Sequence, residues 1–332
     1  GAYWFETQDL ARVASGVALL LLLFACVLLH ELGHALTARR FGFITREITL
    51  LPIGGIARLE RLPDDPRQSL LITLAGPAVN IAIATTLFVL LQLSGQWEPL
   101  TPSSLFDAPL LQRLMLVNIS LVVFNMLPAF PMDGGRALRA ILATRMNDQR
   151  ATHIAARIGQ GMAVLFAFLG WLSNPLLILI ALFVWTGAAA EARTADIRAA
   201  VRGIPIERVM LTAFTTLNPD EPLATAVELM QHEGRHEFPV TRDGHLIGLL
   251  TRQRLLHAIE EGRPDARVAD AMDHAVRAVD PGDMLDTALP LFDAGLSSIV
   301  PVVRDGRLIG LLTAEAIAEF LAIQAARARA AA

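Results

Sequence analysis

Apolar residues dominate long stretches of the first part of the chain, where short polar connectors separate them. Five stretches are apolar enough to predict helices that cross a membrane, although the third and the last two are short. They cover about residues 12–37, 69–93, 113–127, 155–172 and 175–191. This pattern predicts a multi-pass α-helical membrane domain over residues 1–192.

The rest of the chain alternates apolar and polar positions, and it contains one unit twice. Met210 corresponds to Met272 and Thr251 to Thr313, so the two copies are offset by 62 residues. Both contain RDG-x-LIGLLT, and each predicts a strand, a helix, two strands joined by a turn, and a second helix. We expect a cytosolic α/β module with a linker at 193–203, repeats at 204–262 and 263–322, and a tail at 323–332.

The arginines are distributed unevenly among the connectors, and the chain contains no lysine. Six lie between the first two predicted spans, four follow the third span and three follow the fifth, whereas the connectors 94–112 and 173–174 contain none. Cytoplasmic connectors are enriched in basic residues, so this distribution places the arginine-rich connectors and the repeats in the cytoplasm. Residue 1 then lies on the outer side, and we expect one more span before it and six in the full-length protein.

The composition agrees with a membrane protein that carries a soluble module. Charged residues make up 18% of the chain and hydrophobic residues 54%, whereas soluble proteins have about 25% charged residues. The net charge of −4 argues against a strongly basic protein that binds nucleic acid. Cys26 is the only cysteine, which excludes disulfides within the chain and thiolate zinc sites.

The sequence HELGH at 30–34 follows directly on the apolar residues of the first predicted span. Ionisable side chains at membrane depth are costly and normally belong to a functional centre. His30 and His34 are four residues apart, so on a helix they share a face and both can bind one metal ion. Glu31 lies about 100° further round the helix, where it can accept a proton from a water on the metal. We interpret this segment as part of a zinc peptidase built inside a membrane.

A zinc hydrolase usually has three protein ligands, and Asp133 is the candidate for the third. It lies in the segment NMLPAFPMDGG at 125–135, at the end of the third predicted span. The two prolines break the helix, and the two glycines after Asp133 let the backbone turn back toward its neighbours. A carboxylate on such an element can reach a metal held by another helix. In the alternative interpretation, Asp-Gly-Gly is a surface turn.

Three motifs together resemble the site-2 intramembrane metalloprotease family. They are HELGH, AGPAVN at 75–80, and N-x-L-P-x-F-P-x-D-G-G, in an order and approximate spacing that match over about residues 10–190. The resemblance implies zinc bound by His30, His34 and Asp133. It also implies that Glu31 acts first as general base and then as general acid.

The same resemblance implies roles for two amides and a glycine pair. Asn125 matches an asparagine that stabilises the substrate carbonyl or its oxyanion, and Asn80 matches one near the substrate path. Either amide could instead form a hydrogen bond between helices. The segment 48–60, with Gly54 and Gly55, matches a strand or re-entrant segment where substrate pairs by strand addition. A cytosolic hairpin is equally compatible with that segment.

Members of this family cut anti-sigma factors, pro-sigma factors or other membrane-bound regulators. The resemblance therefore implies a membrane-bound protein substrate and regulated intramembrane proteolysis in the cell (inner) membrane. No visible motif encodes the identity of the substrate.

The two repeats resemble a tandem pair of CBS domains, a Bateman module, which commonly binds adenine nucleotides in its central clefts. Ligand-binding members usually have an aspartate three residues after the threonine of the GLLT strand, whereas this chain has Arg254 and Ala316 there. This departure argues against a nucleotide, and a platform for dimerisation or substrate docking is the alternative. His232, His236 and His245 are interpreted as surface histidines, since their spacing makes no convincing metal site.

Two other functions are compatible with parts of the sequence. A CBS-regulated transporter or channel would use the intramembrane acid and imidazoles to line an ion path. It does not explain the i, i+1, i+4 arrangement of His30, Glu31 and His34. The second alternative is a protease-like protein that binds metal but has lost activity, and the intact Glu31 argues against it.

Overall fold

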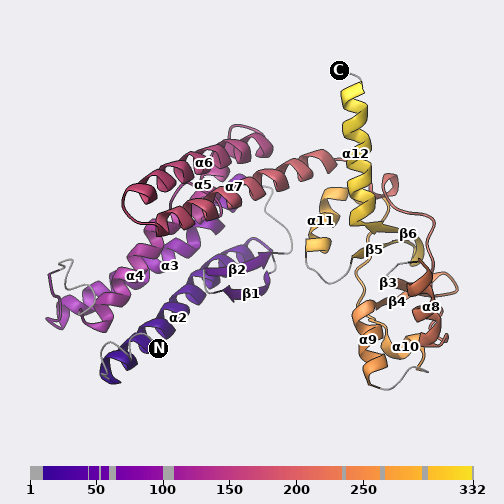
Figure 1. Cartoon of the computed structure of the whole chain (residues 1–332), viewed down its shortest axis with the longest axis horizontal. Coiled ribbons are helices and arrows are strands. Elements are labelled where there is room, and N and C mark those ends of the chain that lie inside the picture. The colour runs from indigo at the N-terminus through magenta and orange to yellow at the C-terminus, as the bar shows by residue number, and fades with distance from the viewer. Residues whose placement is uncertain are drawn as a thin grey trace. The chain divides into compact units, whose positions relative to one another are not determined.

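The computed structural model describes most of the chain as two compact units, Gly1–Asp196 and Ile197–Ala332. The described residues are 10–43, 45–51, 54–59, 65–99, 108–233, 237–261, 266–293 and 298–330. Helices and one hairpin form the first unit, whereas the second combines helices with a four-stranded sheet (Figure 1). A multi-pass helical domain followed by an α/β repeat module is thus confirmed.

The helices of the first unit begin and end where the local sequence favours it. They are α2 (Leu10–Arg40), α3 (Pro66–Leu93), α4 (Leu110–Asn125), α5 (Asp133–Ala143), α6 (Asp148–Leu172) and α7 (Leu176–Val201). The side chain of Asp65 accepts a hydrogen bond from the Arg67 amide at 2.9 Å and so caps α3, with Pro66 in the first turn. Asn147 caps α6 in the same way by accepting from the Arg150 amide.

Four of these helices are long and apolar enough to cross a membrane, namely α2, α3, α6 and α7. The third predicted span corresponds to α4, whose 16 residues reach only about 24 Å, less than the ~30 Å of a hydrocarbon core. Large apolar side chains are exposed along the long helices, including Leu93 at 81% and Trp171 at 82%. Because soluble monomers rarely expose so much apolar surface, this arrangement is that of a membrane protein.

A β-hairpin connects α2 and α3 in the sequence. Strands β1 (Thr45–Leu51) and β2 (Gly54–Leu59) are antiparallel, with Leu50 opposite Gly55, and the two residues between them lie outside the described segments. Both strands contact α2, the helix that carries HELGH (Figure 1). The segment for which a strand was expected therefore lies beside that helix.

The second unit contains one sheet with the strand order β3-β4-β6-β5. Its strands are β3 (Glu237–Arg242), β4 (His245–Thr251), β5 (Ile299–Arg304) and β6 (Arg307–Thr313). Each repeat supplies one antiparallel hairpin, closed by Asp243-Gly244 in the first and Asp305-Gly306 in the second. All four turn residues have φ between 53° and 81°, as a two-residue type I′ turn requires. This geometry explains why the repeated motif begins with Arg-Asp-Gly.

Helices flank this sheet in the same order in both repeats. They are η1 (Ile206–Arg208), α8 (Leu223–Glu233) and α9 (Arg252–Glu260), then α10 (Val268–Ala271), α11 (Leu285–Asp293) and α12 (Ala314–Ala330). The first strand predicted for each repeat is reduced to one bridged residue, Leu217 opposite Val240 and Val279 opposite Val302. A proline two residues later in each repeat cannot donate to a β-ladder, which explains why the pairing ends.

Each repeat buries its own hydrophobic core, and we expect the first core to depend on Phe238, which is 1% exposed. Phe238→Ala should destabilise this repeat by about 3–5 kcal/mol, because it leaves a cavity between β3 and the helices packed on it. Hydrogen exchange of the β3 and β4 amides in the purified full chain should accelerate strongly. Leu256→Ala, at a residue 44% exposed, is the matched control. Unchanged exchange in Phe238→Ala would contradict the prediction.

Candidate metal centre

The uninterrupted helix α2 brings His30 and His34 together on one face, one turn apart. Their Nε2 atoms are 3.1 Å from each other, and the rings meet edge to face with centroids 4.7 Å apart. His30 is 6% exposed, and Glu31, the next residue along the helix, is 8% exposed. All three polar residues of HELGH are thus largely withdrawn from the surface.

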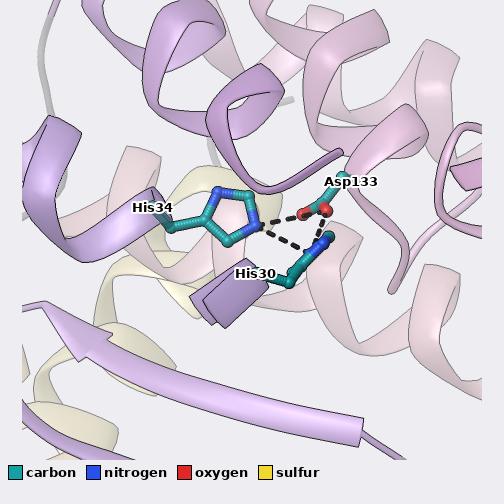
Figure 2. Close-up of side chains that lie close together, drawn as sticks. All are labelled: His30, His34 and Asp133. Carbon is teal, nitrogen blue, oxygen red and sulfur yellow. Dashed lines mark hydrogen bonds and ion pairs between the residues drawn. The ribbon is translucent and has the colours of Figure 1, made fainter. Parts of the chain in front are cut away.

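Asp133 reaches the two histidines because the chain leaves helical geometry between α4 and α5. α4 ends at Asn125, and α5 begins at Asp133 itself. The Oδ2 atom of Asp133 lies 3.1 Å from Nε2 of His30 and 3.3 Å from Nε2 of His34 (Figure 2). With 7% of its surface exposed, Asp133 is buried at the start of a helix and does not lie in a surface turn.

The two glycines after Asp133 allow the chain to fold this tightly. A Cβ atom on Gly134 would lie 2.2 Å from the carbonyl oxygen of Leu127, and one on Gly135 would lie 2.5 Å from the backbone of Ala129. Backbone atoms cannot move aside as flexible side chains do, so any larger residue would force α5 away from the preceding loop. The Asp-Gly-Gly motif therefore sets the position from which Asp133 approaches the histidines.

A contact from α3 fixes the ring of His34. Its Nδ1 lies 2.7 Å from the carbonyl oxygen of Ile72, and a ring N–H donated there leaves the lone pair of Nε2 directed at the other two side chains. Such an outer hydrogen bond is the usual way in which a metal-binding histidine is oriented. For His30, the buried Nδ1 atom has no hydrogen-bond partner among the described residues.

These three side chains fit a zinc ion. They are the group of potential ligands that lie within 4.8 Å of one another in the described part of the chain. Zinc bonds to nitrogen and oxygen are about 2.0–2.2 Å long, so tetrahedral ligand atoms are separated by about 3.3–3.6 Å. The observed separations of 3.1–3.3 Å are close to those values. Two imidazoles and one carboxylate are also a donor set that leaves one position open on a catalytic zinc.

Gly76 of α3 provides the space beside the ligand atoms. A Cβ atom there would lie 2.2 Å from Nε2 of His34 and 2.7 Å from Nε2 of His30, so any residue larger than glycine would crowd both ligand atoms. The sequence motif AGPAVN contains this glycine, but no role was predicted for it. The available signal was a glycine inside an apolar helix, which usually has a packing reason. Gly33 of α2 similarly allows a close approach to Ala75 of α3.

The other proposed site residues lie outside this cluster. Asn80 is fully buried in α3, one turn beyond Gly76, and neither polar atom of its amide has a partner among the described residues. The helix-to-helix hydrogen bond considered for Asn80 is thus not formed within the described chain. Asn125 is half-buried at the last position of α4. Gly54 and Gly55 lie at the start of β2.

The second unit contains no comparable cluster among its described residues. His232 is exposed and contacts the carbonyl oxygen of Glu228 in its own helix, His245 is exposed, and His236 lies outside the described residues. Arg254, at a position where ligand-binding CBS domains have aspartate, forms an ion pair with Asp273 at 2.9 Å. Ala316, at the corresponding position of the second repeat, is buried.

Comparisons with known proteins agree with this architecture. Residues 18–108 and 101–166 match the model of peptidase family M50, and residues 206–261 and 268–323 match the CBS domain. The zinc metalloprotease MJ0392 of Methanocaldococcus jannaschii is 37% identical over 70% of this chain, and the match spans 66% of that relative. A putative zinc metalloprotease, sll0528, of Synechocystis is 29% identical over 96% of this chain and 89% of its own length.

A solved structure of a site-2 protease from Methanocaldococcus jannaschii is also similar. It is 43% identical, with a TM-score of 0.42, over 53% of this chain and 78% of the other. The family models, the metalloprotease relatives and the helical unit that precedes the repeats agree with one another. The chain therefore belongs to peptidase family M50, the site-2 metalloproteases, and carries a tandem pair of CBS domains after its membrane unit.

Proposed function

We propose that this chain is an intramembrane zinc endopeptidase that hydrolyses a peptide bond in or near a transmembrane segment of a membrane-bound regulatory protein. The observation that carries the proposal is the convergence of His30, His34 and Asp133, two buried donors and one partly buried donor from two separate segments, with Glu31 next to His30. Ionisable side chains within a membrane-spanning helix are costly and are normally kept only where they have a function.

His30, His34 and Asp133 would hold the zinc ion. When bound, the ion would supply a Lewis acid and an activated water to the site. Glu31 would accept a proton from the attacking water and later donate it to the leaving amine, as a general base and then a general acid. The amide of Asn125 would donate a hydrogen bond to the substrate carbonyl as negative charge develops there.

Substrate would bind in an extended form, because the carbonyl groups of a helix are already hydrogen-bonded and shielded. The hairpin β1–β2 is a two-stranded sheet, so each strand has an edge at which another strand can pair. Its contact with α2 supports substrate addition at the strand with Gly54 and Gly55. Asn80 would lie near the substrate path: its amide is fully buried and has no partner in the described chain, and leaving it unpaired costs free energy.

The substrate class, location and control are further parts of this proposal. Substrate would be an anti-sigma or pro-sigma type of regulator, cleaved in the inner membrane, with the CBS module in the cytoplasm. Control of cleavage by this module is proposed because the tandem CBS domains follow the membrane unit in the same chain. The module could also join two copies of the chain.

The transporter or channel hypothesis fits the described site less well. Three donors at 3.1–3.3 Å around one point are arranged to hold an ion tightly, whereas conduction requires sites that release their ions readily. The hypothesis of an inactive relative is addressed by substitution of Glu31.

Glu31→Gln should retain one zinc ion per chain and lose cleavage of a co-expressed membrane substrate by about 10²–10⁴-fold, since only proton transfer is removed. His30→Ala and Asp133→Ala should lose zinc as well as cleavage. Metal content by mass spectrometry and immunoblots of the substrate measure the two effects. Continued cleavage by Glu31→Gln would end the catalytic assignment, and unchanged zinc content in Asp133→Ala would end the metal assignment.

Gly76→Ala should prevent zinc binding without unfolding the protein. The new methyl group would lie 2.2 Å from Nε2 of His34 and 2.7 Å from Nε2 of His30, so it would crowd both ligand atoms, and the Ile72 contact keeps the His34 ring from turning away. Gly161→Ala is the matched control, because it also adds a methyl group to a helical glycine but has nothing within 4 Å of the new atom. Metal content and circular dichroism are the measurements. A Gly76→Ala protein with full zinc content would refute this role.

We expect no binding of AMP or ATP to the CBS module. Arg254 is held by Asp273, and Ala316 has no polar side chain, so neither can accept hydrogen bonds from ribose hydroxyls. Calorimetry of the purified full chain should therefore show no heat of binding. A variant with aspartate at both positions is the control, and heat in that variant alone would attribute the loss to these residues. Heat with the natural chain would overturn the expectation.

A further inference from the structure

Arg139 of α5 connects three helices near the metal centre. Its Nη1 atom lies 2.6 Å from Oδ1 of Asp148, the first residue of α6, and its Nη2 donates to Oγ of Ser69 in the first turn of α3 at 3.1 Å. The side chain of Arg139 is 13% exposed although it carries a full charge, and Ser69 is buried. A long cationic side chain held this way loses most of its rotamer freedom, so the contacts must favour one arrangement strongly.

Ser69 lies on the face of α3 that also serves the metal centre. It precedes Ile72 by three residues and Gly76 by seven, spacings that place all three on one side of a helix. Ile72 accepts the hydrogen bond from His34, and Gly76 adjoins both imidazoles. The contact from Arg139 therefore fixes α5 to the same surface that fixes the ring of His34.

Side-chain contacts connect the three helices α2, α3 and α5 in pairs. His34 of α2 contacts the carbonyl oxygen of Ile72 in α3, and Arg139 of α5 donates to Ser69 of α3. Asp133 of α5 contacts His34 of α2. α5 has only 11 residues and reaches about 16 Å, and Asp133 stands at its first position. A helix this short turns as one piece, so a displacement at Arg139 would move the Asp133 carboxylate.

We propose that Arg139 is a positioning residue that holds the Asp133 carboxylate at binding distance from the two imidazoles, an inference that rests on the proposed zinc site. The guanidinium group suits this task because its planar fork donates in two directions at once, to a carboxylate on one helix and a hydroxyl on another. A lysine ammonium is a point charge that would hold one partner well and the other poorly.

The test uses the purified full chain in detergent and measures zinc affinity by competition with a chelator. Arg139→Met should raise the zinc Kd by about 10-fold, the lower end of the loss seen when a direct outer contact to a metal ligand is removed, because Arg139 acts on Asp133 through α5. The absorption spectrum of the cobalt(II)-loaded protein should also change, since it reports ligand geometry directly. The zinc Kd of Arg139→Lys should lie between those of Arg139→Met and the natural chain. Arg136 is an exposed arginine on the same helix, so Arg136→Met should have the zinc Kd and the cobalt spectrum of the natural chain.

A second variant separates the effect of the lost contacts from any misfolding of Arg139→Met. The double variant Ser69→Ala and Asp148→Asn leaves Arg139 in place and weakens both contacts, so it should show the same loss of zinc affinity and the same spectral change. If the natural chain binds no zinc, the proposed function fails and this inference with it. If it binds zinc and both variants bind as tightly with an unchanged spectrum, only the role of Arg139 is refuted.

Discussion

The first unit depends on one interaction, the approach of the buried Asp133 carboxylate to the buried His30 and the partly buried His34, with Asp133 and His30 103 residues apart in the sequence. Each of these groups would be costly alone at membrane depth, and together they satisfy one another or a shared cation. Three features bring these side chains together. They are the close packing of α2 on α3 at Gly33, the break between α4 and α5, and the glycines after Asp133. A larger residue at Gly33, Gly134 or Gly135 would meet neighbouring atoms at 2.2–2.8 Å and so push apart the segments that carry the three side chains.

Much of this arrangement could be predicted from local sequence. The four long spans follow from apolar length, the pairing of His30 with His34 from helical periodicity, and the type I′ turns from the repeated Asp-Gly. The approach of Asp133 to the histidines was expected because prolines and glycines interrupt an apolar helix there and HELGH called for a third donor. The spans, the histidine pair and the turns depend on spacings of a few residues, which periodicity determines directly.

Features that depend on contact between distant helices could not be predicted in this way. The position of Gly76 in the sequence does not show that a side chain there would meet Nε2 of His34. The positions of Ser69, Arg139 and Asp148 in the sequence likewise do not show that these three residues contact one another. A full first strand was predicted for each repeat, and that prediction is wrong: propensity favours a strand there, but the following proline limits the pairing to one bridge. Tertiary packing decides such cases.

The glycine on α3 has a practical consequence for finding what the enzyme cuts. A methyl group added at Gly76 would prevent zinc binding at the proposed site and leave His30, Glu31, Asp133 and both asparagines unchanged. If the proposed function holds, such a chain would keep the proposed substrate-binding strand but would not cleave its substrate, and it would differ from the natural protein by a single methyl group. A photo-crosslinker placed in the β1–β2 hairpin of this variant would attach covalently to the uncleaved substrate in living cells and so allow the substrate to be identified.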